Sequence, residues 1–135
     1  MVVEDHVPLA TCLEMLLEAN SYEVIRTVDG AGALESIKLM DFDVILSDLV
    51  MPGLDGYQLH SAVQQIKPHL CDRFIFMSGH PDKAARSSTV SYTGRPVLWK
   101  PFATSTLLAA VEEITRMNSG KAQAGMGPDL AINSP

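Results

Sequence analysis

Short apolar runs alternate with amphipathic stretches along most of this chain. Apolar residues recur at three- and four-residue spacing in four places, which predicts helices over about residues 7–17, 33–40, 57–66 and 104–117. The intervening runs predict five β-strands, at residues 2–3, 22–28, 42–46, 73–77 and 96–99. Strands that alternate with helices favour a doubly wound α/β fold, in which a five-stranded parallel sheet carries helices on both faces.

Two segments break this alternation. Residues 81–95 are rich in Ser and Thr, so any helix there is expected to be short or loose. Residues 118–135 contain several Gly and Pro and have neither a helical nor a strand period, which predicts a disordered tail or a linker. The pattern therefore predicts one domain over residues 1–117 followed by a tail over residues 118–135.

Composition narrows the class of protein. The net charge is −6 and no cluster of Lys and Arg stands out, which argues against direct binding of nucleic acid. No apolar run approaches the roughly 20 residues that span a bilayer, and the N-terminus lacks the features of a signal peptide. We therefore expect a cytoplasmic protein with no membrane segment. Cys12 and Cys71 lie far apart in the sequence and are interpreted as two buried or half-buried free thiols, with a disulfide as the alternative.

Polar residues follow four of the predicted strands. Glu4 and Asp5 follow the first, Asp48 the third, Ser78 the fourth and Lys100 the fifth. Because the carboxyl ends of parallel strands meet at one edge of a sheet, these side chains are expected to converge.

Each residue alone is weak evidence for a site, since strand ends commonly carry solvated acids, turn residues or caps. A functional site is favoured because all five residues are expected at the same edge of the sheet, on separate elements. Neighbouring carboxylates repel each other unless a cation is present, and Mg²⁺ prefers carboxylate, carbonyl and water oxygens. A lysine can neutralise an anion and a serine hydroxyl can donate to it, so the set suits phosphoryl transfer.

Three segments also resemble the receiver domains of two-component response regulators. Phe42–Gly56, FDVILSDLVMPGLDG, is similar to the segment that carries their phosphorylation site. Phe76–Gly79 resembles their Ser/Thr-bearing strand, and Trp99–Phe102 resembles their Lys-Pro-Phe signature. The resemblance covers about residues 1–117. It implies a flavodoxin-like fold with strand order 2-1-3-4-5.

The resemblance also implies a role for each matching residue. Asp48 would accept a phosphoryl group from a phosphohistidine on a sensor histidine kinase or a phosphotransfer protein. Glu4, Asp5, Asp48 and the backbone carbonyl of Val50 would hold Mg²⁺. Ser78 and Lys100 would contact the phosphoryl group, Gly79 would leave room for it, and the Lys100–Pro101 peptide would be cis. The protein would then be a signalling phosphoacceptor, rather than an enzyme acting on a separate substrate, and its output would be through protein contact.

Three features depart from the family pattern. Only three residues precede the acidic pair, and the segment 81–95 replaces a regular fourth helix. Val97 stands where the family often has an aromatic residue whose rotation reports phosphorylation. The run from Thr93 to Lys100 is similar to receivers attached to hybrid sensor kinases.

Other readings of the same residues stay open. His6 and His80 lie near the predicted site, so with Glu4, Asp5 and Asp48 they could bind zinc or another transition metal. A Mg²⁺-dependent hydrolase of the dehalogenase type would want a second Asp where Val50 stands, which disfavours that function. A receiver-like interaction module without phosphotransfer is the third possibility.

Overall fold

The computed structural model has a five-stranded parallel sheet. It describes residues 1–79 and 93–133, with side chains as far as residue 119. All four strand pairings are parallel and the strand order is β2-β1-β3-β4-β5. The flavodoxin-like fold predicted from the sequence is therefore confirmed. The strands are β1 (Val2–Val3), β2 (Arg26–Thr27), β3 (Ile45–Asp48), β4 (Phe74–Ser78) and β5 (Val97–Trp99).

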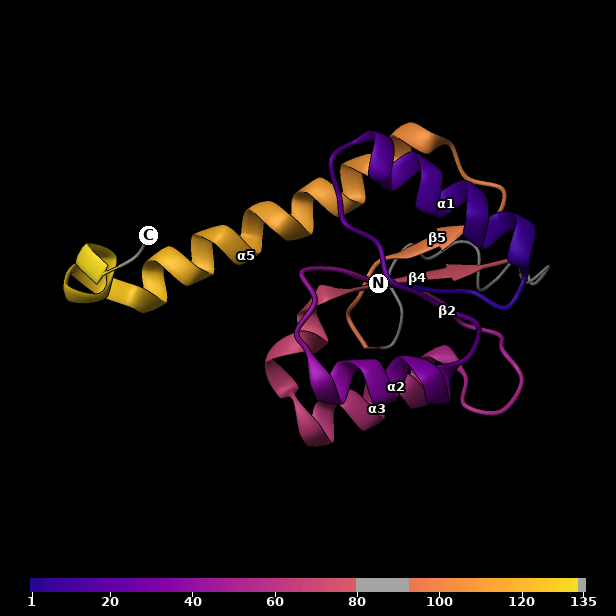
Figure 1. Cartoon of the computed structure of the whole chain (residues 1–135), viewed down its shortest axis with the longest axis horizontal. Coiled ribbons are helices and arrows are strands. Elements are labelled where there is room, and N and C mark those ends of the chain that lie inside the picture. The colour runs from indigo at the N-terminus through magenta and orange to yellow at the C-terminus, as the bar shows by residue number, and fades with distance from the viewer. Residues whose placement is uncertain (80–92, 134–135) are drawn as a thin grey trace.

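Helices cover both faces of the sheet. In Figure 1, α1 and the beginning of α5 lie on one side of the strands, and α2 and α3 lie on the other. This arrangement produces two apolar layers, one on each face. The helices are α1 (Val7–Ala19), α2 (Gly30–Leu39), α3 (Gly56–Ile66), the short 3₁₀ helix η1 (Pro68–Arg73) and α5 (Thr104–Asn133).

Strand alternation explains why both layers are filled. Successive strand residues point to opposite faces, so Val3 packs with α2 and α3 while Val2 packs with α1 and α5. Phe74 and Phe76 of β4 point to the first layer, and Ile75 points to the second. These strands are apolar on both sides because neither face meets water, as is usual for parallel sheets.

The second strand is shorter than its sequence predicts. Ladder pairing is limited to Arg26–Thr27, whereas the β-like pattern extends over residues 22–28. The reason is that β1 contains only Val2–Val3. The Ile25 carbonyl accepts a hydrogen bond from the Val2 N–H, but residues 22–24 have no β1 residue beside them to pair with. Helix α2 begins at Gly30, where the Asp29 side chain accepts a hydrogen bond from the Gly32 N–H at 2.7 Å.

The C-terminal segment also differs from its prediction. Helix α5 runs to Asn133, so residues 118–133 are helical where a disordered tail or linker was expected. Figure 1 shows this part of α5 projecting from the sheet and its helices. A helical backbone forms hydrogen bonds within its own segment, so the lack of an apolar period does not exclude a helix here. The division into a domain over residues 1–117 and a tail remains a prediction.

Most of the Ser/Thr-rich segment, for which a short or loose helix was predicted, lies outside the described residues. Cys12 and Cys71 are free cysteines, as expected; Cys71 is half-buried, whereas Cys12 is exposed, so the expectation of two buried or half-buried thiols is wrong for Cys12. No helix in the described part of the chain combines the length and the apolar character that crossing a membrane requires.

Gly30→Ala should destabilise the fold. A Cβ at residue 30 would lie 2.4 Å from the backbone oxygen of Leu54, so α2 or the loop before α3 would have to move. We expect a loss of about 1–3 kcal/mol in the free energy of unfolding, larger than the gain of about 1 kcal/mol from better helix propensity. Urea denaturation would measure it.

Gly79→Ala is the matched control for this substitution. Its Cβ would meet only side-chain atoms of Lys100, at 3.8 Å, which is an ordinary van der Waals distance. A loss of stability as large for Gly79→Ala as for Gly30→Ala would contradict the steric explanation.

Candidate functional site

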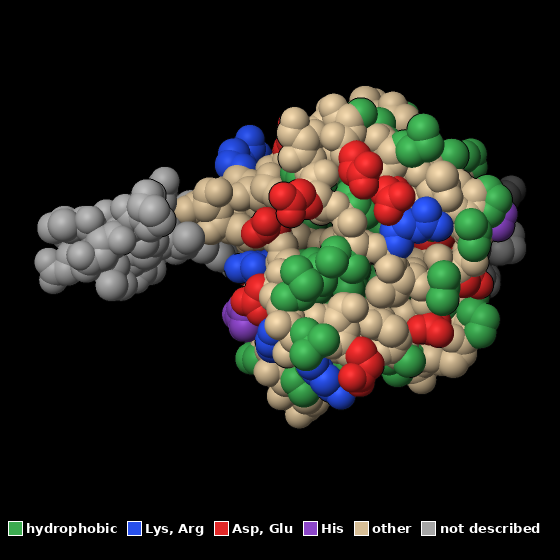
Figure 2. Space-filling view, viewed as in Figure 1, with side chains coloured by type: hydrophobic (Ala, Val, Ile, Leu, Met, Phe, Trp, Pro, Cys, Tyr) green, Lys and Arg blue, Asp and Glu red, His purple; other side chains and the backbone are tan. Residues whose placement is uncertain are grey.

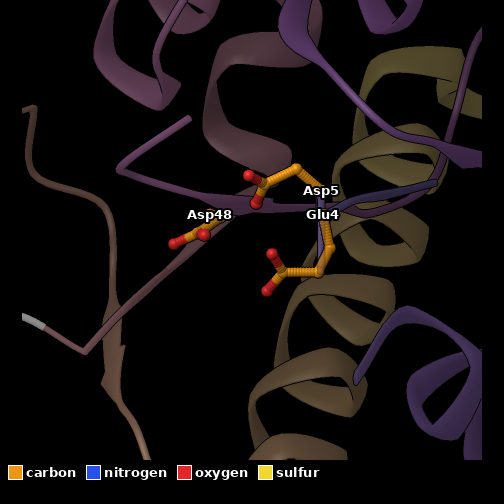
Figure 3. A group of neighbouring side chains, drawn as sticks. All are labelled: Glu4, Asp5 and Asp48. Carbon is orange, nitrogen blue, oxygen red and sulfur yellow. The ribbon is translucent and has the colours of Figure 1, made fainter. Parts of the chain in front are cut away.

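Three carboxylates converge at the carboxyl edge of the sheet. Glu4 and Asp5 come directly after β1, and Asp48 is the last residue of the neighbouring β3. One oxygen from each lies within 4.8 Å of the others. Figure 3 shows the three carboxyl groups pointing into a common space. Glu4 and Asp48 are only 1% and 7% exposed, whereas Asp5 is open to solvent.

Lys100 places a positive charge between the two buried carboxylates. Its Nζ donates to Glu4 Oε1 at 2.7 Å and lies 3.3 Å from Asp48 Oδ2. The residue follows β5, and its backbone N–H donates to the Ser78 carbonyl at 2.8 Å. The Lys100–Pro101 peptide is cis, as the family resemblance implied.

The charges of this cluster shift each other's pKa values. Burial, reinforced by the nearby charge of Glu4, raises the pKa of Asp48 to about 6, although Lys100 acts in the opposite direction. Burial would also raise the pKa of Glu4, but hydrogen bonds from Lys100 and from the His6 N–H hold it below its ordinary value. Burial acts to lower the pKa of Lys100, and its contacts with Glu4 and Asp48 outweigh that effect and raise it.

Tight backbone packing fixes the position of Asp48. The N–H of Leu49 donates to the Met77 carbonyl at 2.8 Å, and the Gly56 N–H donates to the Leu49 carbonyl at 3.1 Å. A Cβ at residue 56 would lie 2.6 Å from the Asp48 carbonyl oxygen, so only glycine permits this approach.

A capping box closes the loop between β3 and α3. The Asp55 side chain accepts from the Gln58 N–H at 2.8 Å, and the Gln58 side chain accepts from the Asp55 N–H at 2.9 Å. The sequence analysis missed this pair, although an Asp three residues before a Gln ahead of a helical stretch is its usual signal.

The remaining predicted residues lie at the same edge of the sheet. Ser78 is buried at the end of β4, directly after Met77, which is the ladder partner of Asp48. Gly79 follows it and faces the Lys100 side chain. Val50 lies in the loop after Asp48 with 65% of its surface exposed. The structure thus brings Glu4, Asp5, Asp48 and Lys100 into one cluster, with the others beside it.

The donor set suits a hard divalent cation. It consists of oxygens from three carboxylates, which share the single positive charge of Lys100. Among the residues that the structure describes, no histidine belongs to a group of potential metal ligands. His6 is exposed beside the cluster, and His80 lies outside the described residues. The zinc hypothesis therefore gains no support from the described residues.

Comparison with known proteins places this architecture in a family. The sequence profile of the response regulator receiver domain matches residues 1–112. The chain belongs to the response regulator receiver domain family. A receiver domain is the phosphate-accepting module of two-component signalling, which agrees with the function that the strand-end residues predicted.

Curated relatives of this receiver domain are longer proteins. The cell cycle response regulators CtrA of Brucella ovis and Brucella canis are each 27% identical over 134 residues, which is 98% of this chain and 57% of theirs. The chain thus spans little more than half the length of these relatives.

Solved structures share the fold. The receiver domain of a signal transduction histidine kinase from Syntrophus aciditrophicus is 27% identical, with a TM-score of 0.73 over 85% of this chain and 87% of that one. The receiver domain of a Pseudomonas aeruginosa sensor histidine kinase is 24% identical, with a TM-score of 0.72 over 84% and 93% of the two chains. The latter was crystallised with a magnesium ion in its active-site cleft.

The position of Val97 bears on how this receiver domain signals. Val97 is the first residue of β5, is 4% exposed and packs in the layer beneath α2 and α3. A buried β-branched side chain has no ring to rotate between an inner and an outer position. Val97, which departs from the family pattern in the sequence, is thus a buried core residue in the structure.

Asp48→Asn should stabilise the metal-free protein at neutral pH. The pKa of Asp48 is raised to about 6 in the fold, so its charged form is disfavoured there relative to the unfolded chain. The expected gain in the free energy of unfolding is about 1–2 kcal/mol above pH 6. It should shrink as the pH falls through 6 and disappear below about pH 4, the ordinary range of an aspartate.

Urea denaturation in EDTA at pH 7 and pH 4 would test this prediction. Glu18→Gln, which neutralises an exposed carboxylate on α1, is the control for general loss of negative charge. Equal gains for the two variants at pH 7 would show that net charge, and not the crowding of Asp48 with Glu4, is responsible.

Proposed function

We propose that Asp48 of this receiver domain accepts a phosphoryl group from a phosphohistidine on a sensor histidine kinase or a phosphotransfer protein. An Asp48 carboxylate oxygen forms the new O–P bond while the N–P bond of the donor breaks, and the electron pair of that bond returns to the imidazole. The product is an acyl phosphate on Asp48. The observation that carries this proposal is the convergence of Asp48 with two further carboxylates and one lysine at the sheet edge.

Lys100 contributes a positive charge to the site both before and after phosphoryl transfer. Before transfer, its ammonium group pairs with Glu4 and lies close to Asp48. After transfer, the incoming phosphoryl oxygens bring additional negative charge to the same place. Because the Lys100 side chain is flexible and keeps a raised pKa, it stays charged and can contact a phosphoryl oxygen.

The neighbouring strand end supplies the other contacts. Ser78 lies beside Asp48 across the β3–β4 ladder, and its hydroxyl is the donor we assign to the phosphoryl group. Gly79 carries no side chain, and the space beside it is bounded by Lys100. We therefore assign to Gly79 the role of leaving room for the added group.

Glu4, Asp5 and Asp48, with the Val50 carbonyl, are the residues that we propose hold Mg²⁺. A bound Mg²⁺ would neutralise part of the charge on the carboxylates and the phosphoryl oxygens. Exposed Asp5 can take up an ion from solvent, whereas buried Glu4 is tied to Lys100 and to the His6 N–H. The magnesium ion in the Pseudomonas aeruginosa receiver domain supports this assignment.

The phosphorylated domain would signal by contact with another protein. We propose further that its partner is a histidine kinase or phosphotransfer protein and that it acts in the cytoplasm. It would not catalyse a reaction on a separate substrate.

Phosphorylation of Asp48 can be tested by intact mass. After incubation with acetyl phosphate and Mg²⁺, the protein should gain the mass of one phosphoryl group. Asp48→Asn should gain none, and neither should the native protein in EDTA. Asp43→Asn, which removes an exposed carboxylate just before β3, is the matched control and should be modified normally. Absence of modification in the native protein would favour an interaction module without phosphotransfer.

The magnesium ligands can be tested without phosphorylation. Asp5→Asn should weaken Mg²⁺ binding about tenfold or more, because it removes one carboxylate from an oxygen-ligand site. The substitution should leave the thermal midpoint of the metal-free protein nearly unchanged, since Asp5 is exposed. Isothermal titration with MgCl₂ would measure the affinity, with Glu18→Gln as the control. Equal affinities for Asp5→Asn and Glu18→Gln would remove Asp5 from the ligand set.

A further inference from the structure

Buried polar side chains are few in the described part of this chain. Figure 2 shows acidic and basic groups spread over the exposed surface of one face of the molecule. Of the polar residues that are buried, Glu4, Asp48 and Ser78 belong to the candidate site. Ser47 is also buried, with 0% of its surface exposed, and it has no assigned part in the proposed phosphoryl transfer. Because a buried hydroxyl needs a hydrogen-bond partner, the partner of Ser47 indicates its role.

Ser47 lies in an apolar layer of the protein. It precedes Asp48 in β3, and its ladder partners are Val3 of β1 and Phe76 of β4. Both partners belong to the layer beneath α2 and α3, and Ile45, two residues earlier in β3, points into the same layer. A polar group gains nothing from apolar surroundings unless it is hydrogen-bonded. Packing alone would therefore favour an apolar side chain here, and the hydroxyl requires another reason.

The partner of the Ser47 hydroxyl is the backbone of the candidate phosphoacceptor. Its Oγ donates to the Asp48 carbonyl at 3.0 Å. The ladder between β1 and β3 reaches only as far as Val3 and Ser47, because the chain then turns into the acidic pair that follows β1. The hydroxyl thus binds a carbonyl that lies one residue beyond the end of this ladder.

This hydrogen bond holds one end of a peptide group whose other end is also held. The Asp48 carbonyl and the Leu49 N–H belong to the same planar peptide group. The N–H donates to the Met77 carbonyl at 2.8 Å, while the carbonyl accepts from Ser47. The next peptide group is fixed as well, because the Leu49 carbonyl accepts from the Gly56 N–H at 3.1 Å. Together these bonds set the direction in which the chain leaves Asp48.

We propose that Ser47 is a positioning residue, whose hydroxyl holds the Asp48–Leu49 peptide group so that the Asp48 carboxylate and the Val50 carbonyl face one bound Mg²⁺. This inference rests on the function proposed for Asp48. Successive strand side chains point to opposite faces, so Ser47 acts through the backbone and not by contact with the metal or the phosphoryl group.

The geometry of the chain explains why this peptide group matters. Rotation of the group changes ψ of Asp48 and φ of Leu49, and both dihedral angles lie between the two proposed ligands, the Asp48 carboxylate and the Val50 carbonyl. Mg²⁺ demands a nearly ideal octahedral arrangement of its ligands, so it tolerates little error in their relative position. Loss of the Ser47 hydroxyl should therefore weaken Mg²⁺ binding even when the fold is intact.

Ser47→Ala, which removes the hydroxyl, and Ser47→Thr, which keeps it, test this role. In the metal-free protein, amide hydrogen exchange at Leu49 should be about threefold or more faster in Ser47→Ala, the factor that one hydrogen bond is worth. Exchange at Phe76, whose N–H donates to the Pro96 carbonyl, should not change. The affinity for Mg²⁺, measured by isothermal titration, should fall by about threefold or more in Ser47→Ala and stay within about twofold of native in Ser47→Thr.

Ile45→Val is the matched control for loss of stability. It removes one methylene from a buried side chain on the same face of β3, so it should lower the thermal midpoint but leave Leu49 exchange and the Mg²⁺ affinity at native values. Equal losses of affinity in Ile45→Val and Ser47→Ala would overturn the positioning role, and so would a Ser47→Thr variant no better than Ser47→Ala.

Exchange at Leu49 is measured without metal or phosphate, so it separates this inference from the proposed function. Native exchange at Leu49 in Ser47→Ala would overturn the role of Ser47 even if Asp48 of the native protein is phosphorylated. Faster exchange at Leu49 with an unchanged affinity for Mg²⁺ would also overturn it, because the hydroxyl would then hold the peptide group without positioning the ligands. Failure of acetyl phosphate to modify the native protein would instead count against the function proposed for Asp48.

Discussion

Two buried carboxylates share one ammonium group in this protein, and the candidate site depends on that contact. Lys100 lies 2.7 Å from Glu4 and 3.3 Å from Asp48, which is enough to keep Glu4 ionised although it is only 1% exposed. It is not enough to restore an ordinary pKa to Asp48. With Asp5, three carboxylates face this one ammonium group, so the ionised cluster carries an excess of negative charge. A divalent cation can relieve that excess, and this links the electrostatics of the fold to the proposed use of magnesium.

The central strand serves the core and the site at once. Val2 and Val3 pack into opposite layers, and the chain then turns directly into Glu4 and Asp5. Strand order places β1 next to β3, so the acids after one strand meet the acid that ends the other. A parallel sheet makes this meeting unavoidable, because the strands end at the same edge.

The sequence analysis predicted the parts that depend on pattern. Alternation of strands and helices predicted the sheet, and the polar residues at strand ends predicted which side chains would meet. It could not predict strand lengths, because these depend on the neighbouring strand: residues 22–24 have a β-like pattern, but β1 has no residues beside them. Nor could it predict that α5 runs to Asn133, since local composition does not show where an exposed helix ends. The raised pKa of Asp48 could not be predicted either, because it depends mainly on how deeply the folded protein buries this carboxylate.

The contact between Lys100 and Glu4 joins residues that are 96 positions apart. During synthesis, Glu4, Asp5 and Asp48 leave the ribosome long before Lys100 does, so the nascent chain carries the acids without their counter-charge. The complete charge constellation arises only when β5 joins the edge of the sheet, because that strand delivers Lys100. The full charge cluster is thus a property of a chain that has folded as far as β5, and a chain that ended before Lys100 would carry the three acids without that counter-charge.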